Sequence, residues 1–135
     1  MTRRARRRAF RLGQWAETLC VADLTVRGYR VLARRLRYPV GEIDIVARRG
    51  GTLAVIEVKA RRDVGDAPAA ISPRQRRRIA RAAEWLRAER PALAQLQPRF
   101  DVMLVAPWRL PRHIRDAWQT EARTKGPADG ETARH

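Results

Sequence analysis

Two apolar runs joined by a Gly-Gly dipeptide constrain the fold of this chain more than any other feature. The runs, residues 41–48 and 52–60, have the length and the Val, Ile and Ala content of β-strands. Between them, Gly50 and Gly51 predict the two-residue turn of a β-hairpin, which fixes the strand register. A three-residue bulged turn would shift that register by one residue.

Hydrophobic periodicity predicts the elements on either side of the hairpin. A helix is expected from Leu12 to Arg27, a strand at 29–36, a second helix at 73–89, a fourth strand at 99–106 and a short helix at 113–122. The hairpin strands carry apolar residues on both faces, so helices are expected to cover both sides of the sheet. The prediction is an α/β fold with an αβββαβ core, in which a mixed central sheet is flanked by helices.

The length and the charge limit the class of protein. The 135 residues fit one domain, and 30 Lys and Arg against 14 Asp and Glu give a net charge of +16. All but two of these cations are arginine, whose planar fork suits phosphate. A nucleic-acid partner is therefore favoured over a merely solvated basic surface, and anionic lipid is a weaker alternative.

The same composition bears on the compartment. No run of 18 apolar residues occurs, so no membrane-spanning helix and no membrane partner are expected. The arginine-rich start has no apolar segment after it, which argues against a secretory signal. The single cysteine, Cys20, excludes an internal disulfide, and a reducing cytoplasm is the expected setting. Residues 1–10 are expected to form a disordered basic arm, residues 11–121 the domain, and residues 122–135 a disordered tail.

A group of charged residues on the hairpin predicts the chemistry. The register places Asp44 opposite Glu57, where two carboxylates repel each other, and both lie in apolar runs that remove water from them. A hard cation such as Mg²⁺ or Mn²⁺ would relieve this repulsion. Lys59 would place an ammonium beside that cation, to hold an attacking water or to stabilise transition-state charge. Strict alternation predicts one face carrying Glu42, Asp44, Val46, Val55, Glu57 and Lys59, and a second, core face carrying Ile43, Ile45, Ile56 and Val58.

Each of these residues also has a simpler interpretation. A Glu–Lys pair across a sheet edge is common on protein surfaces, and Asp44 could form an ion pair with a nearby arginine. Glu17 could lean over the sheet toward the metal or be an ordinary helix-surface residue. Gln75 could complete a capping box begun by Ser72 or reach a phosphate or the lysine. His113 has no partner at ligand spacing, and Trp108 and Trp118 could each close the core or form an exposed aromatic platform.

Several arginines are candidates for phosphate binding. One stripe lies on the outer side of the second predicted helix, and a pair follows the third strand. The candidates are Arg61, Arg62, Arg74, Arg77, Arg78 and Arg81. Such contacts position a nucleic acid without reading its sequence, and no base-reading element is apparent. Selectivity for nucleic-acid structure is therefore expected rather than selectivity for sequence.

The run Gly41-Glu42-Ile43-Asp44, a gap of twelve residues, and Glu57-Val58-Lys59 resemble the D-x(n)-E-x-K signature of the restriction-endonuclease-like, PD-(D/E)xK, nuclease superfamily. Ile43 stands where the motif's name has proline. Over residues 11–118 the chain is similar to the YraN-like family of uncharacterised bacterial proteins. The blocks that carry this similarity are Gly13-Gln14-Trp15-Ala16-Glu17, Gly28-Tyr29-Arg30-Val31-Leu32, Gly41 to Ala47, Val55 to Arg61, Ser72 to Gln75, Arg99-Phe100-Asp101-Val102 and Ile114 to Trp118. That family in turn resembles the archaeal Holliday-junction resolvases, which have an αβββαβ core.

The resemblance implies a two-metal-type phosphodiesterase site. Asp44 and Glu57 would be metal ligands, with the Val58 carbonyl a candidate third, and Lys59 would be the catalytic lysine. The resemblance also implies that Glu17 is an outer ligand and that Gln75 is the polar residue of the following helix.

Three hypotheses follow. The first is a Mg²⁺- or Mn²⁺-dependent endonuclease acting on DNA rather than RNA, and a homodimer would suit symmetrical cutting of two strands. The second is a non-catalytic nucleic-acid-binding module that keeps the nuclease fold. The third is a structural or ribosome-associated protein that binds RNA by charge. The facing carboxylates favour the first, because they would repel a phosphate unless a metal screened them.

Overall fold

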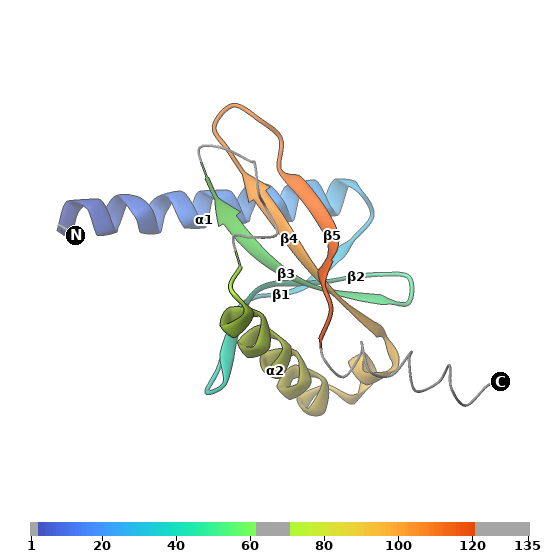
Figure 1. The fold of residues 1–135 in the computed structure, drawn as a ribbon. Helices are drawn as coiled ribbons and strands as arrows, with labels where there is room; N and C mark the ends of the chain where they lie inside the picture. Colours follow the sequence, from blue (N-terminus) through green and yellow to red (C-terminus); the bar gives the residue numbers. More distant parts are fainter. Residues whose placement is uncertain (1–2, 62–70, 121–135) are drawn as a thin grey trace.

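The computed structural model describes residues 3–61 and 71–120, and the side chains of residues 13–61 and 71–120. Two α-helices, five strands and one short 3-10 helix make up this part of the chain (Figure 1). In chain order they are α1 (Arg3–Val26), β1 (Arg30–Tyr38), β2 (Gly41–Arg49), β3 (Thr52–Ala60), α2 (Pro73–Glu89), the 3-10 helix η2 (Pro91–Gln95), β4 (Gln97–Val105) and β5 (Arg112–Trp118).

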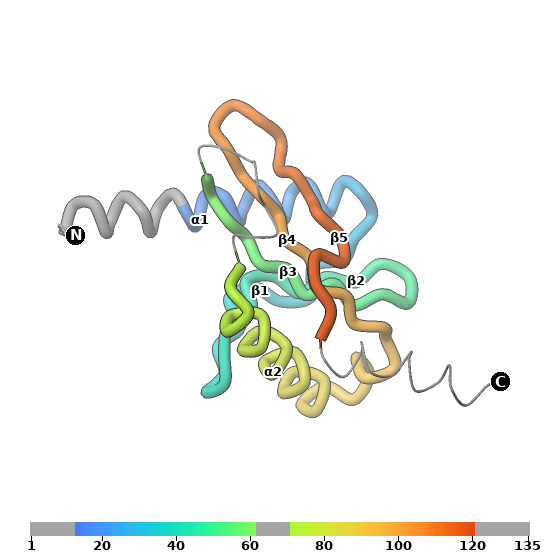
Figure 2. The backbone as a smooth tube through the Cα atoms, in the orientation of Figure 1, coloured from blue at the N-terminus to red at the C-terminus, as the bar shows by residue number. Residues whose placement is uncertain are grey.

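The strands form one mixed sheet in the order β1-β2-β3-β4-β5. Neighbouring strands are antiparallel except β3 and β4, which are parallel and are connected through α2. A parallel pair needs a crossover of this kind, which places its helix on one face of the sheet. Helix α1 covers the opposite face, as the traces in Figures 1 and 2 show. The predicted mixed sheet with helices on both sides is confirmed.

The hairpin register agrees with the prediction from the Gly-Gly turn. Gly50 has a φ of +59°, which glycine adopts without steric cost, and Arg49 pairs with Thr52. Val46 pairs with Val55 in the same ladder, which continues to Ile45 and Ile56. The ladder ends there, one residue before the expected Asp44–Glu57 pair.

Strict alternation along β2 fails at Asp44, and this corrects the predicted faces. Ile43 and Val46 both pack in the core under α2, whereas Ile45 packs under α1. The cause is local. The backbone N–H of Val58 donates to the Asp44 carboxylate at 2.8 Å, whereas in a regular ladder it would donate to a backbone carbonyl of β2. The irregularity turns the Asp44 carboxylate toward β3 and leaves apolar residues on both faces of the strand.

Two elements differ from the sequence prediction. Helix α1 begins at Arg3, so residues 3–10, expected to be a disordered arm, are helical. The helix predicted at 113–122 is wrong, because β5 occupies residues 112–118 and pairs with β4. Without β5 the backbone groups along that edge of β4 would lack partners, and this tertiary demand outweighs the local helical pattern. The tail expected at 122–135 lies outside the described residues.

The side of the sheet under α2 is closed by an aromatic pair. Phe100 and Trp118 stack with ring centroids 5.3 Å apart, and both are buried. Trp118 is therefore a core residue. Of the two interpretations that the sequence left open for it, core or exposed platform, the first is correct. No helix in residues 3–61 and 71–120 is long and apolar enough to cross a membrane.

Candidate functional site

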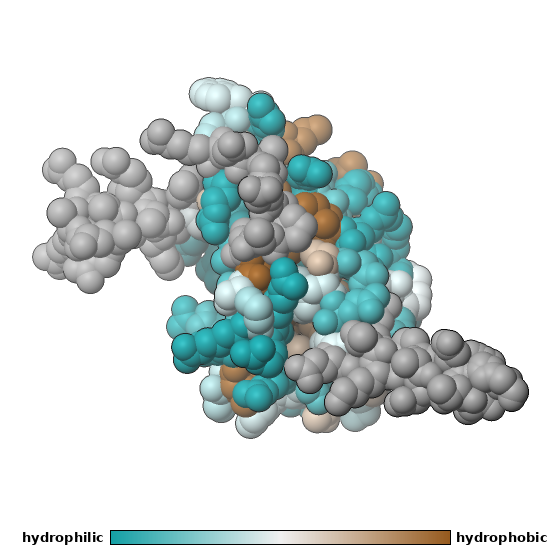
Figure 3. Space-filling view, in the orientation of Figure 1, coloured by the Kyte–Doolittle hydropathy of each residue, from teal (hydrophilic) through white to brown (hydrophobic). Residues whose placement is uncertain are grey.

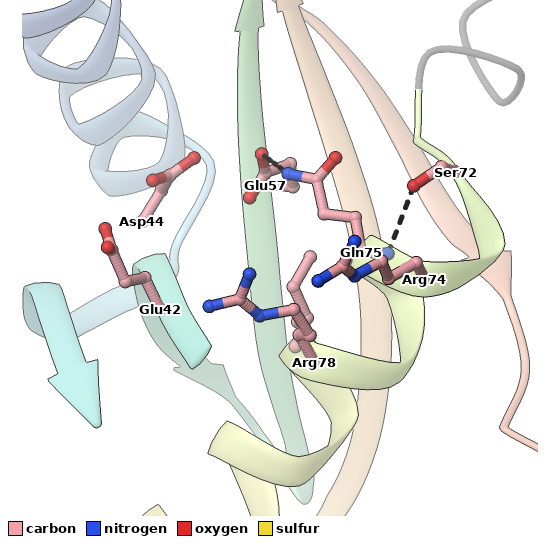
Figure 4. A pocket seen from close by; sticks show the side chains of 8 residues that line it. Glu42, Asp44, Glu57, Ser72, Arg74, Gln75 and Arg78 are labelled. Atoms are coloured by element: carbon pink, nitrogen blue, oxygen red, sulfur yellow. Dashed lines mark hydrogen bonds between the residues drawn. The ribbon is translucent and has the colours of Figure 1, made fainter. Parts of the chain in front are cut away.

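A cleft of about 510 Å³ opens where the first turns of α2 approach β2 and β3 (Figure 4). It is lined by Glu42, Asp44, Glu57, Ser72, Arg74, Gln75, Arg78 and Ile79. Helix α2 comes very close to β2 here, because a Cβ built on Gly41 would lie 2.5 Å from the Arg78 carbonyl oxygen. Only glycine permits this approach, which brings the carboxylates of the sheet to the arginines of the helix.

Asp44 and Glu57 interact directly in this cleft. Burial, and then the neighbouring charge of Glu57, raises the pKa of Asp44 from 3.8 to about 7, although the Val58 N–H bond opposes the rise. Two carboxylates with this mutual effect hold a proton near neutral pH unless a cation replaces it. The sequence-based expectation that the two side chains meet agrees with this geometry, even though they are not partners in the β-ladder.

Glu57 is held on two sides. It is buried, and its Oε2 accepts a hydrogen bond from Gln75 Nε2 at 2.8 Å and lies 3.2 Å from Lys59 Nζ. The Lys59 side chain is itself only 18% exposed. The ion pair confirms that Glu57 and Lys59 lie on one side of β3, and it fixes the ammonium within reach of the carboxylate pair.

The start of α2 follows the sequence prediction only in part. Ser72 is the N-cap, and its hydroxyl accepts the backbone N–H of Gln75 at 3.1 Å. The Gln75 side chain does not return to Ser72 as a capping box requires, so that interpretation is wrong. It donates instead to Glu57, because a buried carboxylate needs donors more than an exposed helix end does.

Glu17, on α1, does not line the cleft and is engaged by two arginines of β1. Its Oε1 accepts from Arg35 Nε at 2.9 Å and Arg34 Nε at 3.2 Å, and its side chain is 9% exposed. Its charge adds to the rise in the pKa of Asp44, so the two carboxylates are near neighbours. Arg34 and Arg35 were not predicted as site residues. They are consecutive in β1 yet reach the same Glu17 oxygen, and Arg35 has a φ of +51°, which departs from extended strand geometry.

Among the described residues, two carboxylates are placed to bind a metal ion together, and no larger group of metal-binding side chains is present. Across residues 3–61 and 71–120, no three or more His, Cys, Asp or Glu side chains are grouped closely enough to hold a metal. Mg²⁺ typically uses one or two protein carboxylates and completes its shell with waters and phosphate oxygens. Asp44 and Glu57 fit that pattern, because they are two oxygen donors destabilised by each other in a cleft that is open to solvent. The ligand roles of Glu17 and of the Val58 carbonyl stay predictions.

The candidate phosphate-binding arginines fall on two sides of α2. Arg74 and Arg78 line the cleft, whereas Arg77 and Arg81 are exposed along a second groove of the helix. Figure 3 shows hydrophilic side chains gathered over the N-terminal part of α2. Arg61 is exposed at the end of β3, and Arg62 lies outside the described residues.

Comparison with known proteins identifies the family. The sequence model of the uncharacterised protein family UPF0102 matches residues 16–105. The chain belongs to this family. A UPF0102 protein of Parvibaculum lavamentivorans is 56% identical over 111 residues, covering 82% of this chain and 84% of that protein. A second, from Maricaulis maris, is 53% identical over 115 residues, covering 85% and 91%. The similarity expected to the YraN-like family is thereby confirmed.

A solved structure supports the fold of this UPF0102 protein. The chain superposes on Archaeoglobus fulgidus Hjc, a Holliday junction resolvase, with a TM-score of 0.54 and 23% identity, covering 81% of this chain and 83% of that one. At this level of identity the similarity establishes a shared nuclease-like fold, and it confirms the expected fold class.

A buried polar cluster, which was not predicted from the sequence, lies on the opposite face. Asp101 has no exposed surface and accepts bonds from both Nε and Nη2 of Arg99, from the Asp116 N–H, and from His113 Nε2 at 2.7 Å. The His113 Nδ1 lies 2.8 Å from an Arg27 donor, so Nδ1 accepts and Nε2 carries the proton toward Asp101. His113 was set aside for want of a partner nearby in sequence, yet its partners are Arg27, directly after α1, and Asp101 of β4. This cluster joins those elements and lies away from the cleft.

Proposed function

We propose that this UPF0102 protein is a metal-dependent endonuclease that hydrolyses phosphodiester bonds in DNA and selects its substrate by structure. The observation that carries the proposal is the pair formed by half-buried Asp44 and buried Glu57, with Lys59 bound to Glu57, inside a cleft lined by arginine. A binding module has no use for two carboxylates facing its phosphates, because they repel the ligand. A divalent cation between them removes both the repulsion and the desolvation cost.

The residues around the pair have distinct roles in this proposal. A bound Mg²⁺ or Mn²⁺ would supply Lewis-acid polarisation of the phosphate and a more acidic water. The Lys59 ammonium orients the attacking water and offsets charge that develops on the phosphate. Gln75 holds Glu57 in place, and Arg74 and Arg78 bind the flanking phosphates across the cleft.

Selection by structure follows from the kind of contacts available. The arginines along α2 contact a backbone, and backbone contacts carry no sequence information. DNA is proposed over RNA because the fold is shared with a protein described as a Holliday junction resolvase. Cutting both strands of a junction would further require two active sites related by two-fold symmetry, which a homodimer supplies. Sedimentation velocity with and without four-way DNA tests that requirement.

The test is calorimetric titration of Mg²⁺ and Mn²⁺ into the wild type, Asp44→Asn and Glu57→Gln, followed by incubation with linear, flapped and four-way DNA. Glu42→Gln is the matched control, because Glu42 lines the same cleft but is 66% exposed. We expect metal uptake and cutting by the wild type and the control only. DNA binding with neither metal uptake at millimolar concentration nor cleavage would overturn the nuclease proposal.

One observation favours the alternative of a non-catalytic binding module. The Glu17 carboxylate is engaged by two arginines and so is not positioned as a third metal ligand. A Lys59→Met variant distinguishes the two functions. Catalysis predicts that this variant binds DNA and metal but does not cut, whereas a binding module predicts that the wild type and the variant behave alike.

A further inference from the structure

The turn between β4 and β5 presents two large apolar side chains to solvent. Trp108 is 100% exposed and Leu110 is 86% exposed, whereas Trp118, at the other end of β5, is 6% exposed. A fully exposed tryptophan buries no surface of its own domain and therefore adds nothing to folding through the hydrophobic effect. Exposed apolar side chains of this size at a projecting tip are typical of interaction sites.

The backbone at Trp108 is also strained. Its φ is +61°, in the left-handed region that glycine occupies readily and that costs an ordinary residue energy. A bulky aromatic residue in this conformation benefits neither the turn nor the core. Strain of this kind is concentrated at binding and catalytic sites, where a required orientation outweighs its cost.

The tip lies beyond the catalytic end of β3. Lys59 pairs with Leu104 and Ala60 with Val105, and the Arg61 N–H donates to the Val105 carbonyl at 2.9 Å. Trp108 follows three residues later, which places it up to roughly 10 Å past the last β3–β4 pair at about 3.3 Å per residue. Figures 1 and 2 show the β4–β5 turn projecting beyond the end of β3.

The charge around the tip indicates the chemistry of its partner. Residues 102–115 contain no acidic side chain, and Arg109, Arg112 and Arg115 are exposed on or beside the turn. An aromatic side chain among arginines is the combination that stacks on a nucleic-acid base while the neighbouring cations hold its phosphates. A basic tip of this kind is complementary to a polyanion.

We propose that residues 107–111 form a wedge, in which Trp108 stacks on an unpaired base or an opened base step beside the cleavage position. The inference rests on the proposed nuclease function and names its substrate class, namely DNA with a branch point or unpaired bases. Arg109 holds the adjacent phosphate. The wedge would supply the structural selectivity that the backbone-contacting arginines of α2 lack.

The experiment measures binding in EDTA, so that it does not depend on cleavage. Four-way, flapped and fully paired DNA carry 2-aminopurine at the branch point or at the equivalent paired position. The proteins compared are the wild type, Trp108→Ala, Trp108→Phe, Arg109→Ala and, as a control, Trp15→Ala, whose tryptophan is 51% exposed on α1. We expect Trp108→Ala to bind branched DNA about 5- to 150-fold more weakly, in keeping with the loss of one stacked base, and paired DNA nearly as before.

The remaining variants separate stacking from charge. Trp108→Phe should recover most of the affinity and the 2-aminopurine signal, and Arg109→Ala should lower the salt dependence by about one phosphate contact, which Trp108→Ala should not. Unchanged preference for branched DNA in Trp108→Ala overturns the wedge, as does an equal loss in Trp15→Ala or an equal loss on paired DNA. Any of these results, with metal-dependent cutting retained by the wild type, leaves the nuclease proposal standing.

Discussion

Replacing Asp44 by asparagine should stabilise the metal-free protein at neutral pH while removing its response to metal. The side chain keeps its shape, and its amide oxygen can still accept the Val58 N–H that Asp44 accepts at 2.8 Å. The amide NH₂ can donate to Glu57, where the carboxylate of Asp44 repels it. The substitution therefore removes one negative charge from a half-buried position without leaving an unpaired group behind.

The magnitude follows from the pKa of Asp44. Burial and Glu57 raise that pKa from 3.8 to about 7, and each pKa unit corresponds to about 1.4 kcal/mol. Because the folded state holds this proton more tightly than the unfolded chain, the free energy of unfolding falls as the pH rises from about 4 to about 7 and then levels off. An asparagine at this position avoids the loss, so the variant should gain at most about 4 kcal/mol over the wild type at pH 8 and almost nothing at pH 4.

The assay is thermal unfolding in EDTA at several pH values between 4 and 8, repeated with excess Mg²⁺. At pH 8 we expect the Tm of Asp44→Asn to exceed that of the wild type by an amount on the order of 10 °C. Mg²⁺ should raise the Tm of the wild type and not that of the variant. Glu42→Gln is the control, because its exposed carboxylate should give no pH-dependent gain. A variant less stable than the wild type by the same amount at every pH would refute the reasoning.

Three further outcomes are expected. Asp101→Ala should lower the free energy of unfolding, measured by urea denaturation, by about 3–5 kcal/mol, because it leaves buried donors without their acceptor. Burial alone would raise the pKa of Asp101, but its hydrogen bonds outweigh burial and lower that pKa. The wild type should therefore lose this stabilisation as the pH falls below about 4. Gly41→Ala should cost about 1–3 kcal/mol and weaken metal binding in calorimetry, because the new methyl group meets the Arg78 carbonyl and pushes α2 from β2. Cys20 should resist iodoacetamide at pH 8 in the folded protein and react once it is unfolded, because burial raises the pKa of its thiol to about 12; labelling of the native protein at the unfolded rate would contradict this.

Features that depend on residues close together in the chain could be predicted from the sequence. The two glycines after Arg49 set the hairpin register, because the length and type of a turn fix which residues of the two flanking strands pair. Ser72 and Pro73 set the start of α2, and hydrophobic periodicity predicted a helix over the residues that α2 occupies. The same register predicted that Asp44 and Glu57 approach each other. The ladder ends at the Ile45–Ile56 pair, however, and Asp44 contacts β3 through the Val58 N–H.

Features whose partners are distant in the chain depend on the folded arrangement. The segment at 112–118 is a strand because an edge of β4 is there to be paired, and no local pattern contains that information. Asp101 and His113 form their cluster with Arg27, the residue after α1, which lies 86 positions from the histidine. Glu17 is held by arginines of β1, which the periodicity of its own helix could not indicate.

The two tryptophans at 108 and 118 show the same division. They are ten residues apart and had the same two interpretations in sequence. The pairing of β4 with β5 carries Trp118 into the core against Phe100 and leaves Trp108 at the projecting turn. Composition supplied the aromatic side chains, and the sheet decided which one is buried and which one faces solvent, because burial depends on where the paired strands end.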